Sequence, residues 1–104
     1  MDKIYSQKDN SYIITPSGYL DLYNIPEIQE TMADLKGTDV VIECDDLRYM
    51  DSAVIRFFAR FADILRETGN RLIFVNLKDY MKDIVNMVGL TDKFVFEYTG
   101  EDRA

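Results

Sequence analysis

Residues 39–66, DVVIECDDLRYMDSAVIRFFARFADILR, decide the fold class of this chain. The segment from Asp39 to Cys44 carries a continuous apolar triplet, which is typical of a strand covered on both faces and predicts a central strand. The acidic residues 45–51 then predict a loop, and helical spacing of apolar residues predicts a helix from Ser52 to about Thr68. Its apolar side chains fill about half of the helix circumference: Val54, Ile55, Phe57, Phe58, Phe61, Ala62, Ile64 and Leu65.

The segments on either side extend this alternation of strands and helices. On the N-terminal side we expect two short strands, an irregular third strand and a helix, at residues 4–8, 12–16, 19–22 and about 25–35. On the C-terminal side we expect a strand, a helix, a last strand and a frayed polar tail, at residues 71–77, 79–88, 94–98 and 99–104. This order predicts an α/β fold in which a mixed central sheet of about five strands has crossover helices.

Length and charge limit the classes of function. The chain has 104 residues, of which 47% are hydrophobic, so it fits a single domain over residues 1–104. Lys and Arg number 12 against 19 Asp and Glu, and the net charge of −7 disfavours nucleic acid as a partner. The sequence shows no secretion signal pattern and no apolar run near the roughly 18 residues of a membrane helix. We therefore expect a cytoplasmic protein without direct membrane insertion.

Cysteine and histidine usage narrows the chemistry further. Cys44 is the only cysteine and the chain has no histidine, so Ser–His and Cys–His catalysis are excluded and a typical zinc site lacks its ligands. We expect no catalytic residue, no metal and no cofactor. Asp45 and Asp46 offer carboxylate oxygens to a hard cation such as Mg²⁺, but a solvated acidic loop is the preferred interpretation, because the sequence indicates no further ligand.

Ser52 stands where the acidic loop runs into the predicted helix. Unpaired backbone N–H groups and the positive end of the helix dipole at this place favour a phosphate or an anionic group of a partner. Serine is also a preferred helix cap, which contributes about 1 kcal/mol without any function. Both interpretations, cap and switch, are open on the residues alone. A second cap is predicted at Asn24, with Glu27 completing a capping box.

Three local patterns, in this order, resemble the STAS domain, the family of bacterial anti-sigma factor antagonists and of the cytoplasmic domains of sulphate transporters. They are Gly18 to Asn24 before the first helix, Met50-Asp51-Ser52 before the second, and Gly89 to Phe94 before the last strand. The resemblance covers almost the whole length. It implies a STAS-like fold and a domain that is not an enzyme.

In the antagonist branch of this family, the serine directly after the aspartate is phosphorylated by an anti-sigma factor that is itself a serine kinase. The resemblance places this role on Ser52. It implies that the unphosphorylated domain binds the anti-sigma factor and frees a sigma factor, and that a serine/threonine phosphatase removes the phosphate. It also implies partner contacts or a phosphate environment at the polar positions Asp21, Asn24 and Asp51. We expect partner contacts at Ala53 and Arg56 as well, and Arg56, one helical turn after Ser52, carries a charge that could stabilise a phosphate.

One position departs from the family pattern, since Val54 stands where the family has a glycine. A β-branched side chain there is expected to narrow the space for a partner's loop. Two alternatives therefore remain open. The chain could be a STAS accessory subunit of a lipid-transport ATPase complex without a serine switch, or a receiver-like domain that accepts phosphate on an aspartate of the group Asp45, Asp46 and Asp51.

Overall fold

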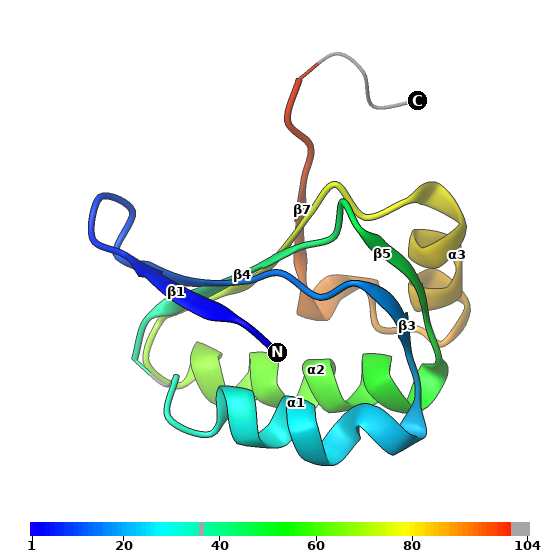
Figure 1. Ribbon diagram of the computed structural model, residues 1–104, viewed down its shortest axis with the longest axis horizontal. Coiled ribbons are helices and arrows are strands. Elements are labelled where there is room, and N and C mark those ends of the chain that lie inside the picture. The colour runs from blue at the N-terminus through cyan, green and yellow to red at the C-terminus, as the bar shows by residue number, and fades with distance from the viewer. Residues whose placement is uncertain (36, 101–104) are drawn as a thin grey trace.

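The structure is a computed structural model, which describes residues 1–35 and 37–100. Its centre is a five-stranded sheet in the order β1-β2-β4-β6-β7, shown in Figure 1. The strands are β1 (Lys3–Ser6), β2 (Ser11–Ile14), β4 (Asp39–Glu43), β6 (Leu72–Val75) and β7 (Val95–Glu97). β1 pairs with β2 antiparallel, and the other three pairings are parallel. The predicted α/β fold with a mixed sheet of five strands is confirmed.

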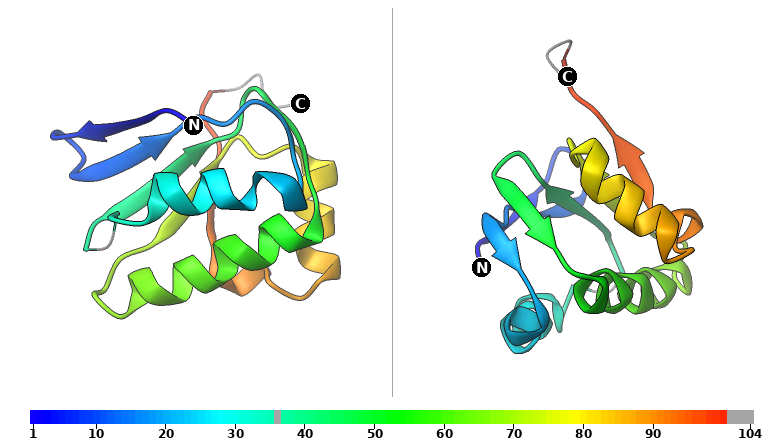
Figure 2. Two further views of the ribbon diagram at one scale, coloured as in Figure 1. Left: turned by 60° about the horizontal axis from the view of Figure 1, so that its bottom comes forward. Right: turned by 90° about the vertical axis from the view of Figure 1, so that its right-hand side faces the viewer.

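Three helices follow the strands in the expected order: α1 (Ile25–Met32), α2 (Ser52–Arg66) and α3 (Asp79–Met87). Two 3₁₀ turns, η1 (Leu22–Asn24) and η2 (Thr91–Lys93), lie before α1 and before β7. Helices α1 and α2 lie side by side against one face of the sheet (Figures 1 and 2). Among the described residues, every helix is too short or too polar to cross a lipid bilayer.

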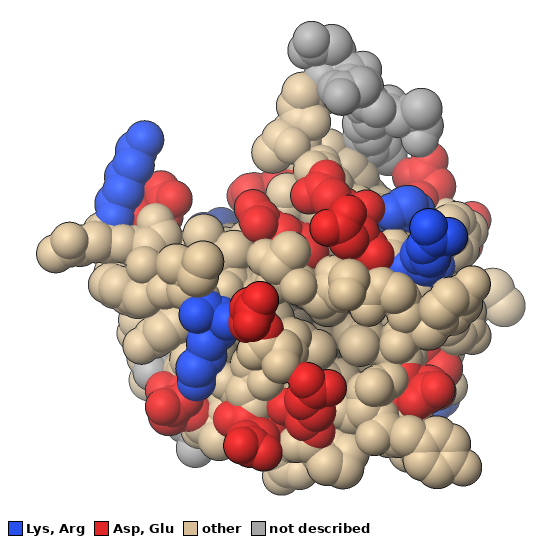
Figure 3. All heavy atoms as spheres, in the orientation of Figure 1, with Lys and Arg blue, Asp and Glu red and all other residues tan. Residues whose placement is uncertain are grey.

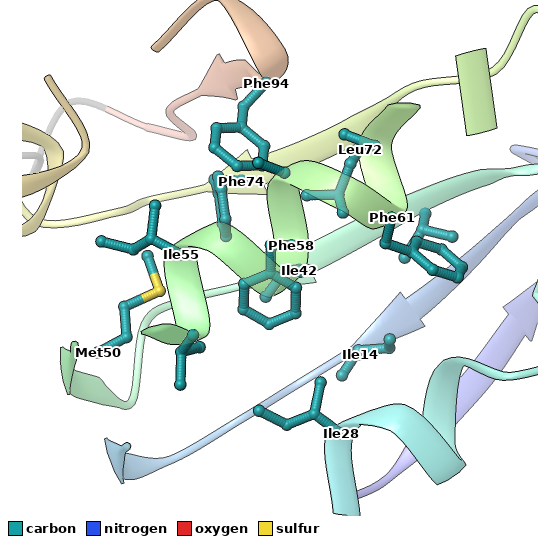
Figure 4. Close-up of a cluster of buried hydrophobic side chains, with 14 of the residues drawn as sticks. Ile14, Ile28, Ile42, Met50, Ile55, Phe58, Phe61, Leu72, Phe74 and Phe94 are labelled. Atoms are coloured by element: carbon teal, nitrogen blue, oxygen red, sulfur yellow. The ribbon is translucent and has the colours of Figure 1, made fainter. Parts of the chain in front are cut away.

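The hydrophobic core fills the space between α2 and the central strands (Figure 4). Phe58 of α2 and Phe74 of β6 meet edge to face with ring centroids 5.8 Å apart, and Phe94 lies 4.8 Å from Phe74 on its other side. Phe58 and Phe74 are at most 1% exposed. The helical spacing of the apolar residues in α2 therefore predicted most of the packed face, but Ile64 is 36% exposed and Phe57 is only half buried. The packed face fixes the helix under the sheet.

A second, two-stranded parallel sheet joins β3 (Gly18–Leu20) to β5 (Leu47–Met50). The irregular strand predicted here is confirmed in β3, where the register shifts between Gly18 and Tyr19 and Gly18 adopts a φ of +70°. The predicted loop over residues 45–51 is wrong, since four of these residues form β5. The strand has buried ends and an exposed middle, so its pattern lacks the alternation by which strands are identified.

Cys44 is fully buried directly after β4, and its thiol donates a hydrogen bond of 3.3 Å to the carbonyl of Ile42. Burial, followed by the charge of Asp45, raises the pKa of this thiol from 9.0 to about 12. We expect the native protein to resist Ellman's reagent and to react only as it unfolds, because the thiolate is the reactive form. Labelling rates in native buffer and in denaturant would check this, and full reaction within seconds in native buffer would contradict it.

The same shift has a consequence for stability. The folded state holds the thiol protonated while the unfolded chain ionises it near pH 9, so this contribution to the free energy of unfolding is complete below pH 9 and decreases between about pH 9 and pH 12. The variant Cys44→Ala should lose this decrease, which urea titrations at pH 8 and pH 10 would measure.

Candidate functional site

The two strands of the small sheet lead to the starts of two helices. β3 continues through η1 into α1, and β5 leads directly into α2, so the N-terminal ends of both helices lie on the same side of the molecule (Figure 1). A hydrogen bond of 3.1 Å from the N–H of Asp51 to the carbonyl of Leu20 joins the two strands at this end. Ser52 and the turn that precedes α1 are therefore neighbours.

Asp51 connects these two segments through its side chain. Oδ1 accepts a hydrogen bond of 3.0 Å from the N–H of Val54, and Oδ2 accepts one of 3.1 Å from the N–H of Leu22. Asp51 has extended backbone angles and is the N-cap of α2. The interpretation of Ser52 as the cap is therefore wrong: Ser52 is the first helical residue. Within the described part of the chain, no hydrogen bond uses its hydroxyl group.

Replacing Asp51 with alanine is expected to lower the free energy of unfolding by about 2 kcal/mol, because the helix loses its cap and the N–H of Leu22 loses its acceptor. Ser52→Ala is the matched control, since the hydroxyl group holds nothing in place. Thermal melts of both variants would compare them. A larger loss in Ser52→Ala than in Asp51→Ala would show that the cap is assigned to the wrong residue.

The turn before α1 is closed by its own polar side chains. The N–H of Asp21 donates to Oδ1 of Asn24 at 2.8 Å, and the N–H of Tyr23 donates to Oδ1 of Asp21 at 2.9 Å. The capping box predicted for Asn24 and Glu27 is wrong, because Asn24 makes no side-chain cap to α1. Glu27 instead pairs with the ammonium group of Met1 at 2.8 Å.

This turn displays two apolar residues. Leu22 is 56% exposed and Tyr23 is 87% exposed, while the flanking oxygens of Asp21 and Asn24 are used inside the turn. Tyr19 and Tyr49, on the two strands of the small sheet, are also exposed, with ring centroids 6.3 Å apart. We call the set Tyr19, Leu22, Tyr23 and Tyr49 the tyrosine surface. Sequence reasoning missed it, although apolar residues between polar turn residues were a signal that could have identified Leu22 and Tyr23.

The remaining predicted residues lie on the first turns of α2. Ala53 is half buried, and Arg56 is exposed and forms no ion pair with another described residue. Val54 has no exposed surface because its side chain points into the core. The expectation that Val54 narrows the space for a partner is therefore wrong, and Ala53 and Arg56 lie on the side of the helix that a partner can reach.

The acidic residues of the β4–β5 connection are held by neighbours. Oδ1 of Asp45 accepts a hydrogen bond of 2.9 Å from the amide of Asn76, and the ammonium group of Lys78 donates to the carbonyl of Asp45. In residues 1–35 and 37–100, no three His, Cys, Asp or Glu side chains lie together as a metal site would need. The group Asp45, Asp46 and Asp51 is thus not assembled as a set of cation ligands, because both oxygens of Asp51 accept backbone N–H groups.

An open hollow of about 570 Å³ adjoins the tyrosine surface at Tyr19. Its lining carries charges of both signs: Ser17, Gly18, Tyr19, Asp45, Asp46, Arg48, Lys78 and Tyr80. Figure 3 shows acidic side chains over several parts of the face in view and fewer basic ones. The hydroxyl of Tyr80 donates a hydrogen bond to the carbonyl of Arg48. Tyr80, which lines the hollow, is therefore fixed against β5.

Comparison of the sequence with known families and proteins gives a consistent result. The STAS domain family model matches residues 3–102. An anti-sigma-B factor antagonist of Staphylococcus aureus (strain NCTC 8325 / PS 47) is 26% identical over 88 residues, which cover 82% of each chain. A protein with the same description from Staphylococcus epidermidis is 26% identical over 87 residues, which cover 81% of each.

Two solved structures share the fold. A candidate anti-sigma factor antagonist from Thermotoga maritima superimposes with a TM-score of 0.77 at 14% identity, covering 95% of this chain and 86% of that one. The anti-sigma factor antagonist SpoIIAA in its unphosphorylated form gives 0.71 at 15% identity, covering 97% and 89%. Together with the family match over nearly the whole sequence, the element order and the β5–α2 junction lead to one conclusion: this chain belongs to the STAS domain family.

Proposed function

We propose that this domain is an anti-sigma factor antagonist, a non-enzymatic regulator that binds an anti-sigma factor through the tyrosine surface and the start of α2. The observation that carries the proposal is the rigid turn at residues 21–24. Its hydrogen bonds display Leu22 and Tyr23 beside a serine hydroxyl group that bonds to nothing else among the described residues. Aromatic residues held in one conformation are typical anchors of protein interfaces. The relatives described as anti-sigma-B factor antagonists support the same role.

The proposal includes a switch at Ser52. An anti-sigma factor with serine kinase activity would phosphorylate the hydroxyl group and so release itself, and a serine/threonine phosphatase would reset the domain. A phosphate adds about −1.5 to −2 charges at neutral pH. Arg56 and the free N–H groups of the helix start would stabilise this charge, whereas the carboxylate of Asp51 would repel it. Because these effects oppose one another, the fold changes little and the partner is expelled by charge and bulk.

The roles of the predicted partner-binding residues divide accordingly. Ser52, Ala53 and Arg56 would contact the partner directly. Asp21, Asn24 and Asp51 would act through the turn, since their side-chain oxygens accept backbone hydrogen bonds. The accessory role in a lipid-transport ATPase complex loses the observation that favoured it, because Val54 is buried.

Incubation with ATP and an anti-sigma factor kinase, followed by mass spectrometry, is expected to place one phosphate on Ser52. Calorimetry should show that Ser52→Ala binds the anti-sigma factor as the unmodified domain does, and that Ser52→Asp binds at least about tenfold more weakly, because a charge introduced at an interface without a partner opposes binding. Melting temperatures of the two variants control for folding. Phosphate on another residue would refute the switch, and equal affinities of the two variants would refute its electrostatic basis.

A further inference from the structure

One row of aliphatic side chains crosses all five strands of the main sheet. Each member pairs with the next across the strands, in the order Ile4, Ile13, Val41, Ile73 and Val95. Five strands at a spacing of about 4.8 Å make this row about 19 Å long.

The row lies on the face that the helices leave uncovered. In β4 and β6 the neighbouring residues Ile42 and Phe74 belong to the core beneath α2, so Val41 and Ile73 point the opposite way. Lys3, next to Ile4, reaches the carbonyl of Thr31 in α1 at 3.0 Å, which places Ile4 on the far side from that helix. None of the five belongs to the core cluster or packs against it. Ile73 at the centre of the row is only 4% exposed between its neighbours on the sheet, Ile13, Val41 and Val95 are half buried, and Ile4 at the edge is 68% exposed. The two views of Figure 2 show no helix of the described residues over this face.

A bare face is unusual for this kind of sheet. β2, β4, β6 and β7 run parallel, and parallel sheets are almost always covered on both faces, commonly by helices. The sequence of β4 already has the continuous apolar pattern of a strand with two covered faces. The described residues supply a helical layer on one face only, so a helix is the covering that the pattern fits.

The charged residues beside the row indicate which charge a partner should carry. Glu43 and Glu97 lie two residues beyond Val41 and Val95 on the same face, and neither forms an ion pair with a described residue. On the other edge, Asp39 is already neutralised by Arg71 at 3.1 Å. A second copy of this chain would bring two such acidic edges together on molecules of net charge −7. A helix edged with Lys or Arg would instead meet both carboxylates.

We propose that the bare face binds a helix of another protein, of about 13 residues, that carries an aliphatic stripe edged by basic residues. The helix lies along the row and places its cations beside Glu43 and Glu97. The surface is separate from the tyrosine surface. Binding to it is therefore independent of the state of Ser52.

Two synthetic helical peptides with the same leucine stripe, one edged with Lys and the other with Glu, provide the test. They are titrated into the labelled full chain while the methyl groups of Ile13, Val41, Ile73 and Val95 are followed by NMR. We expect saturable shifts of these methyl groups with the Lys-edged peptide, and affinity about three- to tenfold lower with the Glu-edged peptide, as for two exposed ion pairs. A scrambled Lys-rich peptide controls for charge alone.

The double variant E43K/E97K should reverse the preference between the two peptides. Its control is E30K/E67K, which changes the net charge equally at exposed positions of α1 and the end of α2 and should keep the preference. Melting temperatures show whether both variants are folded. The proposal is overturned if the two edged peptides bind equally, if binding does not saturate, or if the shifted signals belong to Leu22 and Tyr23. It is also overturned if the methyl signals of the row shift with protein concentration in the absence of peptide, because a second copy of the chain would then occupy the face. None of these results bears on the binding of an anti-sigma factor.

Discussion

Tyr23→Ala is expected to weaken binding of the anti-sigma factor about 30-fold or more, which corresponds to at least about 2 kcal/mol. The ring is 87% exposed in the free domain, so it contributes little to folding and can be buried almost entirely by a partner. The turn that carries it is fixed by the side chains of Asp21, Asn24 and Asp51. Ordering the turn on binding therefore costs little conformational entropy.

Isothermal titration calorimetry of Tyr23→Ala and Tyr23→Phe would measure this effect. The phenylalanine variant keeps the ring and is expected to retain most of the affinity. Met87→Ala is the matched control, because Met87 is apolar and 82% exposed but lies at the end of α3. Wild-type affinity of Tyr23→Ala, or an equal loss in Met87→Ala, would refute the assignment of the tyrosine surface as the binding site.

Phe74→Ala is expected to lower the free energy of unfolding by about 3–5 kcal/mol. The ring has no exposed surface and contacts Phe58, Phe94 and Phe96 at centroid distances of 4.8 to 5.9 Å. Its removal leaves a cavity at the centre of the sheet that these rings cannot fill without moving. Since a domain of this size is stable by only about 5–15 kcal/mol, the variant would be close to unfolding at physiological temperature.

Urea denaturation followed by circular dichroism would give this value. Phe57→Ala is the control, because Phe57 is adjacent in sequence to Phe58 but only half buried, and its loss should be smaller. A loss below about 1 kcal/mol in Phe74→Ala would mean that the aromatic cluster is not the centre of the core.

The sequence predicted the main sheet and its helices because their periodicity is local. The apolar triplet of β4 and the helical spacing of α2 can be recognised without knowing what they contact. β5 could not be recognised in this way. Leu47 and Met50 are buried on a strand that pairs with the distant β3, and the exposed Arg48 and Tyr49 between them remove the alternation of a strand.

The sequence predicted where the candidate site lies, at the start of α2, but not the roles of the individual side chains. The order of Asp51 and Ser52 at a helix start located the site, but serine and aspartate are both good caps, and only the backbone angles show that Asp51 has this role. The resemblance to the STAS family implies partner contacts or a phosphate environment at Asp21 and Asn24. In the structure their side chains hold a turn, and the residues exposed between them are Leu22 and Tyr23. This exposure depends on the fold and not on residue type.

The parallel pairing of the strands also affects how the chain folds. Ile14 pairs with Ile42, and Ile42 pairs with Phe74, so each of these two parallel pairings closes a loop of about thirty residues. Sheets of this kind fold slowly compared with hairpins and helical bundles. The tyrosine surface needs Gly18 beside Leu47. A chain emerging from the ribosome is thus expected not to display the complete tyrosine surface until β5 has been synthesised and has paired with β3.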